Sequence, residues 1–116
     1  MAIDWKEDEN YGLVTFDMDI DGEFYVKDFV VTNFYGEVAS LLETLNKESL
    51  KEGYEYIEFE AHLWDENTDK VIGVISGQLP IDFLQNYEDF STVAAQIDIE
   101  ENMENLFLPT FLEEEN

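Results

Sequence analysis

Three aspartates alternate along one short segment in a spacing that could bind calcium. They are Asp17, Asp19 and Asp21, followed by Gly22, with Asp28 at the twelfth position. Calcium takes oxygen ligands at alternating positions of such a loop, and the glycine permits its sharp bend. The usual last ligand is a bidentate glutamate, whereas Asp28 stands here, and the flanking residues alternate as strands. We therefore predict a hairpin with an acidic outer face, and weak calcium binding by the three aspartates stays open.

Residues for enzymatic chemistry are scarce. His62 is the only histidine, and the chain has no cysteine and no arginine. Acid–base catalysis requires a positioned partner in a pocket, and anionic substrates are usually held by arginine. The lack of cysteine excludes disulfides, thiolate chemistry and cysteine-based zinc sites. We expect no enzyme activity, cofactor or metal, with a glycosidase-like carboxylate pair as the one enzymatic alternative.

Negative charge dominates the composition. Twenty-nine acidic residues stand against five lysines, giving a net charge of −24 on 116 residues. Duplex DNA carries one negative charge per ~1.7 Å of axis, so the same charge corresponds to about 40 Å of duplex. A compact domain of this length is roughly 35 Å across. The folded chain therefore has about the charge of an equal length of DNA and should attract proteins that bind phosphates.

The C-terminal part of the sequence carries acids without any cation. After Lys70 there is neither lysine nor arginine, so local ion pairs cannot form there. On a helix, Glu100, Glu101 and Glu104 would share one face, with neighbours ~5–6 Å apart. The predicted partner-binding residues are Glu88, Asp89, Asp98, Glu100, Glu101 and Glu104. A second candidate set is Glu58, Glu60, Asp65 and Asp69.

Hydrophobic periodicity predicts the elements that position these residues. Residues 11–20 alternate as a half-buried strand, and residues 24–32 resume with aromatic and β-branched residues after a turn. Together they predict a β-hairpin in which Asp17 lies opposite Lys27. Apolar residues at i, i+3, i+4 and i+7 then predict an amphipathic helix over residues 37–50.

A second hairpin is predicted from strands at residues 54–64 and 71–76, joined by a polar turn. Its first strand should direct four residues toward the core: Ile57, Phe59, Ala61 and Leu63. Pro80 can begin a helix because its missing N–H is not needed there, and we expect one or two helices between Pro80 and Phe107. Pro109 should stop any helix.

These elements predict a small α+β domain. Its sheet is antiparallel, with about four strands in two hairpins, one central helix and C-terminal helical structure. Residues 1–112 form the single acidic domain, and residues 113–116 form an acidic tail. The acidic start of the sequence does not match a secretory signal, and no apolar run approaches the ~20 residues needed to span a bilayer. We expect a cytoplasmic protein that binds neither membranes nor nucleic acid directly.

The leading hypothesis is a non-enzymatic inhibitor that mimics the charge of DNA. Its partner would be a basic nuclease or DNA-binding protein, and its composition is similar in character to that of phage counter-defence proteins of the anti-restriction or anti-CRISPR type. Electrostatic attraction would make association fast and sensitive to salt. The alternatives are an immunity protein that neutralises a cognate nuclease toxin, and an acidic accessory subunit that recruits a basic partner. The oligomeric state stays open.

Overall fold

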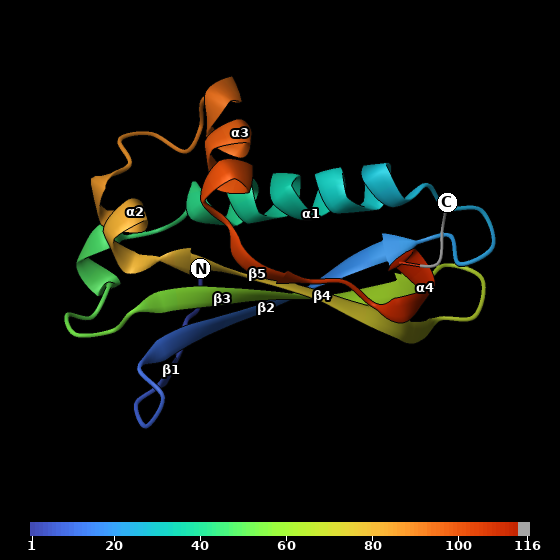
Figure 1. The fold of residues 1–116 in the computed structure, drawn as a ribbon, viewed down its shortest axis with the longest axis horizontal. Coiled ribbons are helices and arrows are strands. Elements are labelled where there is room, and N and C mark those ends of the chain that lie inside the picture. The colour runs from blue at the N-terminus through green and yellow to red at the C-terminus, as the bar shows by residue number, and fades with distance from the viewer. Residues whose placement is uncertain (114–116) are drawn as a thin grey trace.

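One mixed β-sheet organises the computed structural model, which describes residues 1–113 (Figure 1). Its strands lie in chain order: β1 (Asp4–Lys6), β2 (Tyr11–Ile20), β3 (Tyr56–Asp65), β4 (Lys70–Pro80) and β5 (Glu104–Phe107). β2 and β3 are parallel, and the other neighbouring pairs are antiparallel. The α-helices are α1 (Lys27–Leu42), α2 (Ile81–Asn86), α3 (Val93–Asn102) and α4 (Thr110–Glu113), with a short 3₁₀ helix at Lys47–Ser49.

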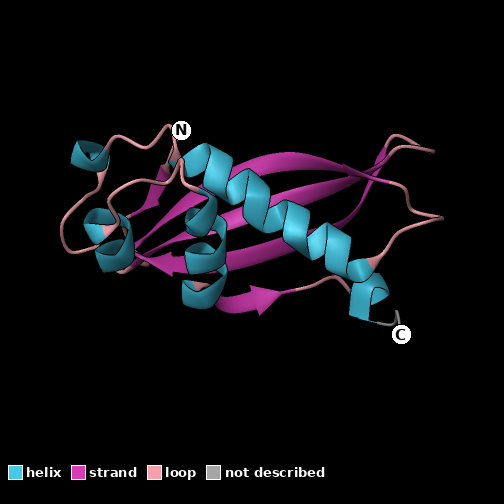
Figure 2. Cartoon of the chain, turned by 90° about the horizontal axis from the view of Figure 1, so that it is seen from above, coloured by secondary structure: helices cyan, strands magenta, loops and turns pink. Residues whose placement is uncertain are grey.

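Helix α1 covers one face of the sheet and closes the core. It crosses the strands diagonally, as Figure 2 shows from above. Its buried residues include Val30, Phe34, Val38 and Leu42, which repeat every four positions and form one stripe. The stripe belongs to the same core cluster as four inward residues of β3 that are fully buried. The prediction that Ile57, Phe59, Ala61 and Leu63 face the core is confirmed.

The predicted first hairpin is wrong. Residues 27–42 form a helix, and β2 pairs in parallel with β3, so that Asp17 lies beside His62 and not Lys27. Aromatic and β-branched residues favour a strand, but in residues 24–32 this preference is outweighed by burial of the helical stripe that begins at Val30. A parallel pair needs a crossover connection, and α1 supplies it.

The second hairpin is confirmed, because β3 and β4 are antiparallel neighbours. β4 continues to Pro80, which then caps α2, so the prediction that Pro80 begins a helix also holds. Residues 104–107 were expected to be helical, but they form β5 at the edge of the sheet. The antiparallel four-stranded sheet is therefore corrected to a mixed sheet of five strands among the described residues.

The C-terminal end differs in part from the prediction. Pro109 does not end a helix, because α4 begins directly after it. Of the predicted acidic tail, Glu113 is the last residue of α4, and residues 114–116 lie outside the described residues. Within residues 1–113, none of the helices is both long enough and apolar enough to cross a bilayer.

Candidate functional site

The structure distributes the six predicted partner-binding acids over three elements. Glu88 and Asp89 lie in the loop before α3, whereas Asp98, Glu100 and Glu101 lie on α3 itself. Helix α3 ends at Asn102, and Glu104 is the first residue of β5. The expectation that Glu104 shares a helix face with Glu100 and Glu101 is therefore wrong.

Two of these acids are engaged within the fold. The Asp89 carboxylate accepts hydrogen bonds from the backbone N–H of Ser91 at 2.9 Å and from its hydroxyl at 2.6 Å. These bonds lower the pKa of Asp89. The Tyr87 hydroxyl donates to Asp98, and this bond is the main cause of the raised pKa of Tyr87. Asp89 and Asp98 therefore support the loop and the helix. Glu88, Glu100 and Glu101 are exposed, as is Asp89.

The outer side of α3 combines apolar and acidic residues. Ala95 and Ile99 are buried toward the body of the protein, whereas Val93 is 93% exposed and Ile97 is 57% exposed. The next turn of the helix brings two glutamates beside Ile97, because residues three and four apart are neighbours. We define the α3 ridge as Val93, Ile97, Glu100 and Glu101.

A second acidic surface lies on the opposite face of the sheet. Helices α1, α2 and α3 all lie on one side of the strands, and the other side is open (Figure 1). Successive side chains of a strand point to opposite faces, so residues that alternate with buried ones on β2 and β3 lie on the open face. The open-face carboxylates are Asp4, Asp17, Asp19, Glu58, Glu60 and Glu104.

The strand register brings these carboxylates into rows. Asp4, on β1, is paired with Leu13, which is paired with Glu58 on β3. The same row continues through Gln78 on β4 to Glu104 on β5. Neighbouring strands lie ~4.8 Å apart, and every second residue along a strand is ~6.6 Å away. Carboxylates from all strands except β4 therefore share a single rigid surface.

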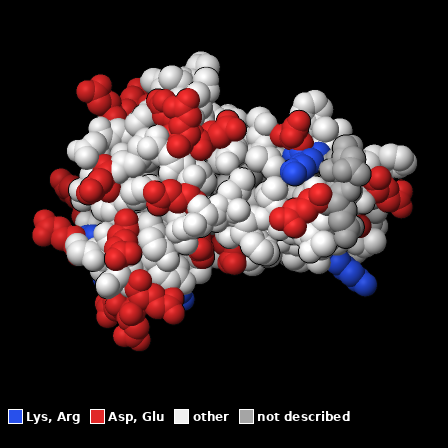
Figure 3. All heavy atoms as spheres, viewed as in Figure 1, with Lys and Arg blue, Asp and Glu red and all other residues white. Residues whose placement is uncertain are grey.

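Few cations neutralise this surface. Three ion-pair contacts occur within residues 1–113: Lys6 with Asp4 at 2.7 Å, Lys51 with Glu7 at 3.9 Å, and His62 with Glu60 at 3.3 Å. Such partly exposed pairs add little free energy of folding. In the view of Figure 3, acidic side chains form many separate groups among uncharged residues, and cations appear at only a few points. The negative field of the folded protein is therefore largely uncompensated.

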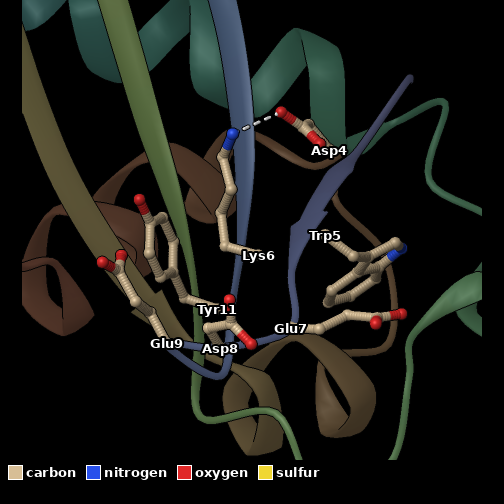
Figure 4. A pocket seen from close by; sticks show the side chains of 7 residues that line it. All are labelled: Asp4, Trp5, Lys6, Glu7, Asp8, Glu9 and Tyr11. Carbon is tan, nitrogen blue, oxygen red and sulfur yellow. Dashed lines mark ion pairs between the residues drawn. The ribbon is translucent and has the colours of Figure 1, made fainter.

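The β1–β2 hairpin forms an open hollow beside this surface (Figure 4). Its lining is Asp4, Trp5, Lys6, Glu7, Asp8, Glu9 and Tyr11. Lys6 and Tyr11 project from one side of the hairpin, and Trp5 from the other. Burial raises the pKa of Tyr11, and the charges of Glu9 and Glu58 raise it further. A hollow with this balance of charge suits a cationic side chain of a partner.

Aromatic rings lie among the open-face carboxylates. Tyr11 and Tyr56 are paired across β2 and β3, and their rings stack with centroids 5.2 Å apart. Burial raises the pKa of Tyr56, and the negative charge of Glu58 raises it further. Trp64 lies further along β3, and its indole N–H is buried without a hydrogen-bond partner among the described residues. The surface therefore offers apolar contact area as well as charge.

The aspartates of the partial calcium motif do not form a calcium loop. Asp17 and Asp19 are exposed on β2, whereas Asp28 lies in the first turn of α1. The Asp21 carboxylate accepts hydrogen bonds from the backbone N–H groups of Glu23 at 2.9 Å and Phe24 at 3.1 Å, and these bonds help to lower its pKa. In the part of the chain described, residues 1–113, no group of three potential ligands could hold a metal.

The second candidate set is also divided. Glu58 and Glu60 are open-face carboxylates, but Asp65 is 8% exposed and lies on the side of the sheet that α1 covers. Asp65 accepts hydrogen bonds from Gly22 N–H at 3.1 Å and from the Thr68 hydroxyl at 2.9 Å. Asp69 is exposed in the β3–β4 turn with a φ of 56°. Only the two glutamates can therefore contribute to a sheet-face site.

Sequence reasoning missed the combination of β2 with β3. The alternation of residues 11–20 already placed Asp17 and Asp19 on a polar face, but the expected hairpin put them opposite the wrong partner. Nothing in a strand's own pattern states which strand lies beside it. Comparison of the chain with protein-family models, with curated proteins and with solved structures gives no match.

Proposed function

We propose that this protein is a non-enzymatic acidic inhibitor that binds a basic nuclease or other nucleic-acid-binding protein in place of DNA. The observation that carries the proposal is the open face of the sheet, where six carboxylates share one surface with a single lysine. The backbone of a sheet fixes these charges before binding, so little ordering entropy opposes association.

The overall dimensions agree with charge mimicry. The protein measures 42 × 33 × 22 Å, and its charge is −24. Duplex DNA of about 40 Å carries a similar charge. A cleft that accepts a duplex could thus receive a body of comparable length and charge. Binding would block the cleft sterically and would neutralise the lysines and arginines that normally contact phosphates.

The acids around α3 form a separate candidate surface, because α3 lies on the helix-covered side of the sheet (Figure 1). Its exposed members are Glu88, Asp89, Glu100 and Glu101. We assign the main contact to the open face because its six acids are held on paired strands of one sheet, whereas the acids around α3 are divided between a loop and a helix.

The first experiment is a pull-down from a cell lysate at low salt, followed by elution with duplex DNA. A basic nuclease or DNA-binding protein released by the duplex and by salt supports the proposal. An immunity protein that binds outside the active site of its toxin would keep its partner in the presence of DNA. An accessory subunit would bind its partner without inhibiting it, which an activity assay on that partner detects.

Two charge-matched variants locate the contact. The open-face variant carries Asp17→Asn, Asp19→Asn, Glu58→Gln and Glu60→Gln. The control carries Asp82→Asn, Glu88→Gln, Glu100→Gln and Glu101→Gln, so both lose four negative charges. We expect the open-face variant to bind more than about tenfold more weakly, which is about 1.4 kcal/mol, and the control to lose less. The reverse result would assign the contact to α3.

A further inference from the structure

The turn between β2 and α1, together with the first turn of α1, exposes large apolar side chains on a highly charged protein. Phe24 is 81% exposed, Val26 is 50% exposed and Phe29 is 70% exposed. We define these three residues as the apolar corner. Single exposed apolar residues are common on protein surfaces, whereas apolar patches mark contact sites. These three large side chains lie within six positions of one another.

The fold holds this corner in place. The Asp21 carboxylate accepts from the backbone N–H groups of Glu23 and Phe24, and the amide of Asn67 donates to the same carboxylate at 3.0 Å. The Asp65 carboxylate accepts from Gly22 N–H at 3.1 Å. Two aspartates, Asp21 and Asp65, therefore tie this turn to the β3–β4 turn.

Tyr25 is the inward counterpart of the exposed residues. Its hydroxyl donates to the backbone carbonyl of Phe111 at 2.8 Å, and the two rings meet edge to face with centroids 5.3 Å apart. This anchor faces the protein while its neighbours Phe24 and Val26 are exposed. The apolar corner is thus a pre-organised feature, and binding it would cost little conformational entropy.

We propose that the apolar corner inserts into an apolar pocket with a basic rim on the same partner that binds the open face. This inference rests on the proposed function. Charge complementarity selects the rim, because acids outnumber the one lysine, Lys27, around the corner in sequence. These acids are Asp19, Asp21, Glu23 and Asp28. A second copy of this chain also has a net charge of −24 and would be repelled. An anionic membrane would repel the corner for the same reason.

In this proposal the open face attracts the basic partner, and the apolar corner determines which basic protein is bound. Rim charges act mainly on association and on its dependence on salt. Buried apolar anchors act mainly on dissociation, and a few of them carry most of the binding free energy. The two contacts therefore leave different signatures in the same binding measurement.

The test compares Phe24→Ser/Phe29→Ser with the control Val93→Ser/Ile97→Ser, which removes two exposed apolar residues from the α3 ridge. The probe is the purified partner that duplex DNA releases in the pull-down. We expect the Phe variant to bind at least about tenfold more weakly at every salt concentration, with faster dissociation and an unchanged slope of affinity against salt. The control should bind as the wild type does.

Other results would contradict either the role of the apolar corner or the proposed function. Equal loss in both variants, or no loss in the Phe variant, overturns the apolar corner while the open-face variant still tests the proposed function. If no DNA-released partner is recovered, both proposals fail. If the wild type self-associates and the Phe variant does not, the corner binds a second copy. If the wild type binds anionic vesicles and the Phe variant does not, the corner binds a membrane. Thermal unfolding confirms that the variants are folded.

Discussion

The two faces of β3 differ completely although they belong to one ten-residue strand. On the covered face Ile57, Phe59, Ala61 and Leu63 are fully buried. On the open face the alternating residues are partly exposed and mostly polar or charged. Because the side-chain period of a strand is two residues, residues that stabilise the core alternate along β3 with residues that carry surface charge. The binding surface can therefore be altered without disturbing the core.

Replacement of a covered residue should have the largest effect on stability. Phe59→Ala removes a fully buried ring under α1, and such changes lower the free energy of unfolding by about 3–5 kcal/mol. Glu60→Gln on the adjacent position should change it by less than about 0.5 kcal/mol. Urea unfolding measures both. Similar losses for the two variants would refute the division between faces.

Acid should destabilise the end of the sheet where Asp21 and Asp65 lie. Hydrogen bonds to both carboxylates lower their pKa values in the folded state. Their contribution is therefore complete above the unfolded pKa of about 3.9 and is lost as pH falls through the lower folded values. Asp65→Asn should lower the melting temperature at pH 7 and should weaken this dependence on pH. Melting curves between pH 7 and pH 2 test it.

The open-face carboxylates should respond to substitution in the opposite way to Asp65, because they project charge and do not tie two turns together. Neutralising Asp17 and Asp19 removes repulsion and no internal hydrogen bond within the described residues. If Asp17→Asn/Asp19→Asn destabilised the protein as Asp65→Asn does, the open face would be structural and not a free binding surface.

The smallest effect should come from salt. Raising ionic strength from 0.01 M to 0.15 M shortens the Debye length from about 30 Å to about 8 Å, which reduces self-repulsion in a protein of charge −24. We expect the melting temperature of the wild type to rise. The rise should be smaller for the four-site open-face variant, which carries fewer charges. Calorimetry at the two salt concentrations measures the difference.

Local patterns predicted some elements well. The alternation of residues 11–20 predicted β2 with its observed bounds, and the strand expected at 54–64 is β3 displaced slightly along the chain. The start of α1 was missed because Val26 offers no side-chain cap and Phe24, Tyr25 and Val26 have strand-forming side chains. The apolar spacing from Val30 to Phe34 and Val38 was the signal available for the helix.

The candidate site depended on information that single elements lack. Charge alone indicated a basic partner, and the polar faces of β2 and β3 were each readable. These two polar faces form one surface only in the parallel register that pairs Asp17 with His62 and Leu13 with Glu58. Glu104 was misplaced because residues at helical spacing preceded it, whereas tertiary contact with β4 draws it into the sheet.

The parallel β2–β3 pair also governs how the chain folds. Paired residues such as Tyr11 and Tyr56 are about 45 positions apart, whereas β3 and β4 meet through a short turn. Non-local pairing slows folding because the connecting loop loses entropy before contacts compensate. The β3–β4 hairpin should therefore form before β2 pairs with β3. During synthesis on the ribosome, β2 also emerges first and stays unpaired until β3 follows. Through that delay, Asp17 and Asp19 would keep the unpaired strand from joining other chains.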